Sequence, residues 1–414
     1  MKCKRSSSSR VLIITRIGVM TLGFLGVSLL AEHWTTGPFR AAAAAELLIA
    51  PTRPLIVNGA GQEIVRATVT GPPFHAPELF QGFEDFYHPQ LKRLREEYQL
   101  DKVVEDETNE FQRILKLRHW VHGRWPVDND ENFSGDAFAI LEKAKTGCGF
   151  NCSHSMAVQQ AVFSAMGYVA RNVLVDRNHE DHGRSLHHGV NEVWSNDHAT
   201  WVLLDAKYDI HFERDHLPLS ALQLHEAVRA NGGSGIVMVR GSDRREVPMD
   251  HSQPPARPSE ATVRSYWWVG YPQRQNPFTQ PHFAARERLL IFDNEAFRQT
   301  TWYRGNDKVL IKHWAYDAKA FIPTADRTQI EWTPGVPELR ARSVSPTELD
   351  VEIRSATPNF EAYVLRINDD PAQVVADGRV RWKLEPGENT LQVHTRNLFG
   401  VEGSLVTATV ALQP

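Results

Sequence analysis

The sequence predicts an α+β domain, with one buried helix packed on an antiparallel sheet, followed by a small all-β sandwich. Residues 152–166 are apolar on almost every side, as is typical of a helix in the middle of a domain, and strand patterns follow it directly. From about Thr333 to the C-terminus, short alternating apolar segments are separated by regular turns, which favours a sandwich.

The length predicts several domains. The chain has 414 residues, of which 42% are hydrophobic, and a single core stops growing at about 250–300 residues. We expect five regions, which are a signal peptide or N-terminal anchor (1–45), an extended N-terminal β layer (46–105), the α+β core (106–232), a β-rich extension of that core (233–332) and the sandwich (333–414).

The first region has the pattern of a targeting segment. A basic, Ser-rich head precedes an apolar run, Val11 to Ala31, that only Arg16 interrupts, and the alanines at 41–45 are suited to cleavage. This pattern predicts export to the periplasm, the cell surface or the medium. The alternative is an uncleaved anchor from Ile17 to Ala31, although spanning a bilayer takes about 20 residues.

The net charge argues against a nucleic-acid-binding protein, and the cysteine count excludes a scaffold held together by disulfides. Residues 1–45 hold six of the 46 basic residues and one of the 50 acidic residues, so the remainder carries a net charge of −9 and has no electrostatic reason to bind nucleic acid. That remainder has only Cys148 and Cys152, which excludes a disulfide-stapled scaffold. The pair is either a local disulfide or a nucleophile with a neighbouring thiol.

Three helices are predicted in the first half of the core. The prolines spread through 46–105 indicate few long elements there, whereas an apolar stripe of helical period begins at Thr108, with Asp106 or Thr108 as the N-cap. A second helix lies near 136–145. A third runs from Cys152 to Met166, where Gly167 ends it.

Strands are predicted at 168–175, 189–194 and 200–205, the last two joined by a turn at 195–198. The two-residue period of a strand allows such a hairpin to bring His188 and Asp205 together on one face. Cys152 lies in the first turn of its helix, where the helix dipole favours a thiolate. A thiol, an imidazole and a carboxylate in this order are what a nucleophile, its general base and the orienter of that base require.

These motifs resemble the transglutaminase-like superfamily from about Thr108 to Phe212. The family's core helix starts at a catalytic cysteine and leads to a Gly-x-x-Ala-Arg strand, matched here by Cys152 and by 167–171. A histidine then opens a strand with a glutamate four residues on, as His188 and Glu192 do, and the third motif is Trp-Val-x-x-Asp at 201–205. The Glu192 spacing selects His188 over its neighbour His187.

The resemblance implies a papain-related fold with a triad of Cys152 as nucleophile, His188 as general base and acid, and Asp205 as the residue that holds the imidazole tautomer. The sequence departs from the family pattern in three places. Met156 stands where the family often has alanine, Tyr-Val at 168–169 replaces Ile-Pro, and the loop before His188 is rich in histidine. The first two departures change packing and leave the triad intact.

The His-rich loop raises a metal-binding alternative, which would exclude the thiol mechanism if His188 were a ligand. A ligand set needs a fixed geometry that a polar loop rarely has, so we expect no metal and no other cofactor. The candidate ligands are His179, Glu180, Asp181 and His182.

Beyond the triad, residues 218–228 predict a helix that Ser220 caps and Gly232 ends. The segments 266–271 and 288–292 predict strands, and we interpret the aromatic cluster at 266–268 as core packing rather than a sugar platform. The last strands, 384–400, resemble those of immunoglobulin-like or fibronectin-type modules appended to exported bacterial enzymes.

The sequence therefore predicts an exported thiol enzyme that acts through a thioester on an amide or isopeptide bond, by hydrolysis or amine transfer. We expect a protein or peptide as its substrate, or a polymer of the cell envelope, and contact with a membrane only through an uncleaved N-terminal segment. The alternative is a catalytically silent binding or assembly module at the cell surface. The oxyanion donors expected are the Cys152 N–H and a side chain near Trp120.

Overall fold

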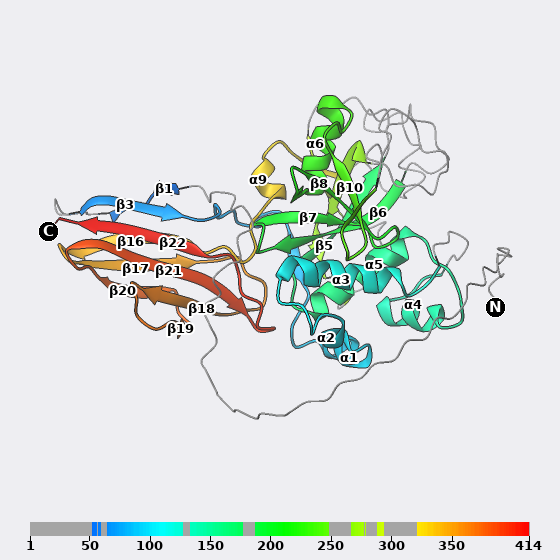
Figure 1. The fold of residues 1–414 in the computed structure, drawn as a ribbon, viewed down its shortest axis with the longest axis horizontal. Helices are drawn as coiled ribbons and strands as arrows, with labels where there is room; N and C mark the ends of the chain where they lie inside the picture. Colours follow the sequence, from blue (N-terminus) through cyan, green and yellow to red (C-terminus); the bar gives the residue numbers. More distant parts are fainter. Residues whose placement is uncertain are drawn as a thin grey trace, which may run out of the picture. The chain divides into compact units, whose positions relative to one another are not determined.

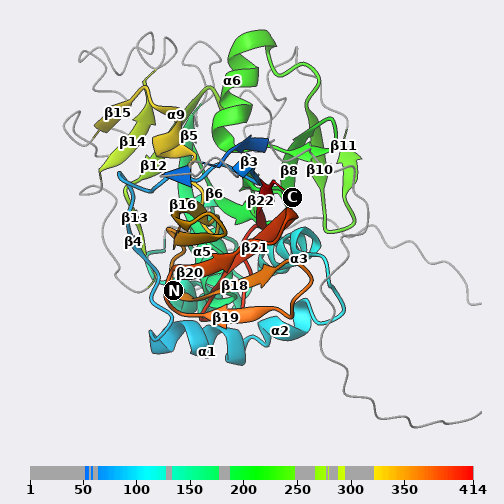
Figure 2. The same cartoon turned by 90° about the vertical axis from the view of Figure 1, so that its left-hand side faces the viewer.

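A mixed sheet and one buried helix form the centre of the α+β part. The computed structural model describes residues 52–55, 57–58, 64–126, 133–176, 187–247, 266–276, 278, 288–293 and 321–413. In this sheet the strand order is β15-β14-β12-β5-β6-β7, and all of its neighbouring strands are antiparallel except β14 and β15. Figure 2 labels β15, β14, β12, β5 and β6 of this sheet. The strands are β5 (Ala170–Asp176), β6 (His187–Ser195), β7 (Thr200–Leu204), β12 (Trp268–Pro272), β14 (Leu289–Phe292) and β15 (Phe321–Thr324).

Helix α5 packs against β5 and β6 (Figure 1). It runs from Cys152 to Ala165, and ten of its fourteen residues are buried, which explains why its sequence is apolar all round. Gly167, at φ 83°, ends the helix with a backbone conformation that glycine adopts without strain. The neighbouring helices are α1 (Pro89–Glu97), α2 (Leu100–Val103), α3 (Glu110–His122) and α4 (Ala137–Ala144).

A second, smaller sheet follows the β6–β7 hairpin in the α+β part. Its strand order is β11-β10-β8-β9, and α6 follows β9. A capping box between Ser220 and Gln223 begins α6, and Gly232 in the left-handed conformation ends it, as predicted. The elements are β8 (Ile210–Arg214), β9 (Leu217–Pro218), α6 (Ala221–Asn231), β10 (Val237–Arg240) and β11 (Arg245–Val247).

The C-terminal β-rich region fits a sandwich of two sheets. One has the order β1-β3-β22-β21-β18-β19 and the other β2-β16-β17-β20 (Figure 1). Their strands are β1 (Thr52–Pro54), β2 (Val57–Asn58), β3 (Ile64–Thr70), β16 (Glu338–Ser345), β17 (Glu348–Arg354), β18 (Phe360–Ile367), β19 (Gln373–Val375), β20 (Arg379–Lys383), β21 (Gly387–Asn397) and β22 (Val406–Leu412). Trp382, with no exposed surface, packs in the shared core.

The N-terminal strands complete this sandwich. Sequence reasoning treated 46–105 as a layer of its own, but β3 pairs with β22 over the register Thr407↔Thr70 to Leu412↔Ile64, and β2 pairs with β16. Short strands without helical neighbours carry too little local pattern to show which distant edge they join.

Other boundaries differ from the sequence prediction by a few residues. Asn109, rather than Asp106 or Thr108, caps α3, because its side chain accepts the Gln112 N–H at 2.8 Å. Helix α1 was not predicted. It begins at Pro89, which occupies the first helical turn, where a missing N–H costs nothing, whereas the sequence pattern of this region indicates few long elements. The short parallel pair β13 (Arg274–Gln275) and β4 (Gln81–Phe83), and the turn helix α9 (Arg327–Ile330), complete the described elements.

Buried hydrogen bonds join the sandwich to the α+β part. The Asn397 side chain donates to the Gly167 carbonyl at 2.8 Å, just beyond the end of α5. The indole N–H of Trp201 in β7 donates at 2.7 Å to the Trp332 carbonyl, in the segment that leads from α9 to β16 of the sandwich. Both parts lie in one compact unit, Pro51–Pro414. Among the described residues, no helix is long and apolar enough to cross a bilayer.

If β3 is an integral strand of the sandwich, truncating its buried side chain destabilises the protein. Val69 is 6% exposed and lies between Arg53 of β1 and Ala408 of β22. We expect Val69→Ala to lower the free energy of unfolding by about 2 kcal/mol, from lost methyl burial and a residual cavity. Urea denaturation measures this change.

Val65 on the same strand is the matched control, because it is 71% exposed. The Val65→Ala variant should change the free energy of unfolding by less than about 0.5 kcal/mol. Equal effects of the two substitutions would contradict the placement of β3 in the sandwich.

Candidate active site

Cys152 is the first residue of α5, and Asn151 holds it there. The Asn151 side chain accepts the Ser153 N–H at 3.0 Å, in the extended conformation expected of an N-cap. Cys152 is partly exposed and carries a free thiol, so the local bridge to Cys148 that the sequence left open is not formed. The thiol therefore lies at the positive end of a helix dipole and is accessible.

His188 and Asp205 form a short, buried contact. His188 Nε2 lies 2.6 Å from Asp205 Oδ2, and the two residues are 9% and 1% exposed. The other Asp205 oxygen accepts the Tyr208 N–H at 3.2 Å, so both carboxylate oxygens are engaged. The ring of Tyr208 lies beside the imidazole, with centroids 5.5 Å apart.

The register of the β6–β7 hairpin produces this contact. Trp194 is paired with Trp201 and Glu192 with Leu203, so side chains at even positions of β6 and odd positions of β7 share a face. Extending this register puts His188 diagonal to Asp205 on that face. The structure thus brings together the histidine and aspartate that the sequence selected, and their catalytic role stays a prediction.

Charges in the site favour a thiolate. Burial opposes ionisation of Cys152, but the hydrogen bond and positive charge of His188, helped by the Gly189 N–H and by Lys207, lower the pKa of the thiol to about 7. Burial also favours a neutral imidazole, but the charge of Asp205 and its hydrogen bond outweigh this and raise the pKa of His188. The lowered pKa of Cys152 and the raised pKa of His188 both favour a thiolate–imidazolium pair near neutral pH.

The His188 ring has a distinct partner at each nitrogen. Since Nε2 faces Asp205, the hydrogen bond between the imidazole and Cys152 falls to Nδ1. Asp205 therefore fixes which nitrogen is presented to the thiol.

Glu192, the glutamate of the sequence motif, binds Arg171 and the start of α6. Its Oε2 accepts from Arg171 Nε at 2.7 Å, and its Oε1 accepts the Ala221 N–H at 2.5 Å, at the start of α6. The Arg171 guanidinium lies 3.8 Å from the centroid of the Trp201 ring. This buried pair ties β5, β6 and α6 together beside the site.

Sequence reasoning missed two neighbours of the triad, Lys207 and Tyr208. They lie two and three residues after Asp205 in the β7–β8 turn, so their position just after the third motif was the only signal in the sequence. Lys207 is 6% exposed. Its charge contributes to the lowered pKa of Cys152.

Of the two predicted oxyanion donors, the Cys152 N–H has a position that the structure describes, and the side chain near Trp120 stays a prediction. In the part of the chain that is described, the Cys152 N–H makes no hydrogen bond, as expected for the first residue of a helix. Trp120 instead contacts Tyr98, at 5.8 Å between centroids, and Arg124 lies over its ring.

The metal-binding alternative falls on residues 177–186, which lie outside the described residues. Among those that are described, no group of three or more His, Cys, Asp or Glu side chains is arranged to hold an ion.

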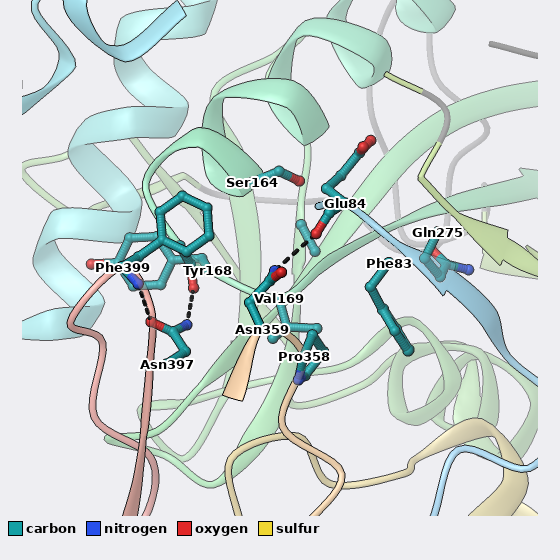
Figure 3. Close-up of a pocket in the computed structure, with 12 residues that line it drawn as sticks. Phe83, Glu84, Ser164, Tyr168, Val169, Gln275, Pro358, Asn359, Asn397 and Phe399 are labelled. Atoms are coloured by element: carbon teal, nitrogen blue, oxygen red, sulfur yellow. Dashed lines mark hydrogen bonds between the residues drawn. The ribbon is translucent and has the colours of Figure 1, made fainter. Parts of the chain in front are cut away.

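A cavity lies at the opposite end of α5 from Cys152. It is lined by Ser164, Tyr168 and residues of the sandwich such as Asn397, and the Asn359 side chain donates to the Glu84 carbonyl at 2.8 Å beside it (Figure 3). A helix of fourteen residues is about 20 Å long, so this cavity is distant from the thiol.

Comparison with known protein families gives a match to the segment that contains Cys152, His188 and Asp205. Residues 98–206 match the family model described as the transglutaminase-like superfamily. Cys152, His188 and Asp205 all lie within the match. No curated protein matches the chain.

The charge arrangement predicts how alkylation of Cys152 depends on pH. Iodoacetamide reacts with the thiolate, so the labelling rate should rise with pH around a midpoint near 7, the value to which the pKa is lowered. In His188→Ala the positive charge is absent while burial remains, so the midpoint should move to 8.5 or above, given an ordinary thiol pKa of about 8.5. Mass spectrometry of the labelled peptide measures both rates.

A Cys152→Ser protein reports labelling at other cysteines, which is subtracted. Identical midpoints in the wild type and His188→Ala would show that the imidazole does not activate the thiol.

Proposed function

From the premise that residues 98–206 form a transglutaminase-like domain, we propose that the protein is a thiol enzyme that cleaves or exchanges an amide or isopeptide bond through a thioester on Cys152. The observation that carries this proposal is the free thiol at the start of α5, with a lowered pKa, beside an imidazole whose far nitrogen is 2.6 Å from Asp205. An inert binding module has no need of such an ion pair.

The first half-reaction follows from these positions. The Cys152 thiolate attacks the carbonyl carbon of the amide, and the oxyanion that forms accepts the Cys152 N–H, which makes no hydrogen bond to another described residue. The imidazolium of His188 then gives its Nδ1 proton to the leaving amine as the C–N bond breaks. A thioester and a neutral imidazole remain.

The second half-reaction reverses these roles. His188 takes a proton from water, or from a primary amine, which attacks the thioester carbonyl and displaces the thiolate. Asp205 keeps the ring oriented and stabilises it whenever it is protonated. Water yields a carboxylic acid and an amine yields a new amide, so the incoming nucleophile alone distinguishes hydrolysis from transfer.

We propose a protein or peptide as the substrate, with a cell-envelope polymer as the other class. The support is chemical, since the thioester mechanism requires an acyl group that an amide supplies. Export is proposed on the signal-like pattern of 1–45, which lies outside the described residues. No cofactor enters either half-reaction.

The test is ammonia or amine release from a glutamine- and lysine-rich denatured protein, with and without added hydroxylamine, which traps a thioester. We expect Cys152→Ala to lower the rate by about 10⁴-fold or more, because the nucleophile is removed. Asp205→Asn should lower it by about 10²- to 10⁴-fold through the wrong imidazole tautomer.

Ser153→Ala is the matched control, because Ser153 is the exposed neighbour of the nucleophile in the same helical turn. It should retain wild-type activity. If Cys152→Ala released ammonia at the wild-type rate, the enzyme proposal would be wrong. If the wild type formed no acyl adduct with any such substrate and its thiol were inert to alkylation, the silent binding module would be favoured.

A further inference from the structure

Helix α3 is bonded to the turns at both ends of β7. At its N-terminal end the Glu110 carboxylate accepts the Asp197 N–H at 2.9 Å and the Asn196 side-chain N–H at 2.7 Å, both in the β6–β7 turn. The Phe111 N–H donates in return to Asp197 at 3.2 Å. This end of α3 therefore holds the turn that precedes β7.

At its C-terminal end α3 holds the β7–β8 turn, residues 205–209. Arg118 Nε donates to Asp209 Oδ1 at 2.8 Å, and His119 Nδ1 lies 2.6 Å from Asp209 Oδ2. His122 Nδ1 is 3.1 Å from the Ala206 carbonyl. The thirteen residues of α3 measure about 20 Å and the five of β7 about 17 Å, so one helix spans the strand and is fixed at both of its ends.

Arg118 is the most constrained member of this contact. All three of its guanidinium nitrogens donate, to Asp209, to His211 Nδ1 at 2.9 Å and to the Gly241 carbonyl at 2.9 Å, and the side chain is fully buried. Burial lowers the pKa of Arg118, while attraction to Asp209 and to Asp205 opposes this. Because Arg118 is fixed by three partners, and Asp209 also contacts His119, the Asp209 carboxylate has little freedom to rotate.

Asp209 is coupled to Asp205 through a closed turn. The Asp205 N–H donates to the Ile210 carbonyl at 2.9 Å, and the Ile210 N–H donates back to Asp205 at 3.1 Å. Asp209 adopts φ 56°, a left-handed conformation that aspartate tolerates and that a tight turn requires. A displacement of Asp209 is therefore passed on to the backbone that carries Asp205.

We propose that the buried Arg118–Asp209 pair is a positioning device that sets the orientation of the Asp205 carboxylate against His188. This inference rests on the proposed function, since it concerns the same triad. Arg118 and Asp209 are positioning residues that act through Asp205.

The energetics of buried charges support a geometric role. A buried ion pair can often be replaced by apolar side chains with no loss of stability, because its attraction hardly exceeds the cost of desolvating both charges. A hydrophobic contact has no preferred direction, whereas the charge-assisted hydrogen bond from Arg118 Nε to Asp209 Oδ1 fixes one donor and one acceptor direction. The pair contributes the orientation that apolar packing lacks.

The experiment measures the pH midpoint of Cys152 alkylation in the full chain, together with the thermal unfolding midpoint. Arg118→Lys keeps the charge but loses the planar fork, and Arg118→Met/Asp209→Asn removes both charges without leaving one unpaired. We expect each to raise the alkylation midpoint by about half a pH unit, which lowers the labelling rate at pH 6 about threefold.

Lys116→Met is the matched control. Lys116 is a cation on the same helix, but it pairs with Asp106 at 2.7 Å, away from the turn. Its midpoint should equal that of the wild type. Since His119, His211, Glu213 and Arg244 also lie in this charged network, the labelling curves are compared over the same pH range in every variant.

The outcomes are distinguishable. Unchanged midpoints in folded Arg118→Lys and in the double variant, with a shifted midpoint in His188→Ala, would overturn the positioning role and leave the proposed function intact. A midpoint that His188→Ala also fails to shift would instead overturn the proposed function. If Arg118→Lys fails to fold, the double variant alone decides between these results.

Discussion

The short contact between His188 and Asp205 is the constraint on which the rest of the site depends. It is buried, and it holds the far nitrogen of an imidazole whose near nitrogen faces the thiol. In a medium of low dielectric constant this pairing outweighs the cost of burying a charged imidazole, and so it also lowers the pKa of Cys152. Without it the pKa of the thiol would be raised by burial and no longer lowered by the charge of His188.

The surrounding elements fix the two ends of this contact separately. Residue His188 is carried by β6, which the buried Arg171–Glu192 pair ties to β5 and α6. Residue Asp205 is carried by the turn after β7, which α3 holds through Asp209. Cys152 comes from a third element, α5, whose start is set by Asn151. A site of defined geometry requires that each of these elements is fixed in place, because movement of any one of them displaces the reacting atoms.

The sandwich is built from both ends of the described chain. Its larger sheet places β3 next to β22, and the Asn397 side chain at the end of β21 donates to the Gly167 carbonyl, just beyond the end of α5. The sandwich itself brings no side chain into the triad, which lies wholly in 152–205.

The sequence by itself determined the elements whose signals are local. The apolar run of α5, the cap at Ser220, and the three motifs around Cys152, His188 and Asp205 all lie within short windows, where helical period, capping and strand alternation are readable. Only the tertiary structure decided the remainder. Arg118 and Asp209 are 91 positions apart, and β3 is separated from β22 by most of the chain, so neither pairing leaves a local pattern. Helix α1 was missed for the opposite reason, since Pro89 is a loop signal in a sequence but a favourable first residue once a helix packs on α5.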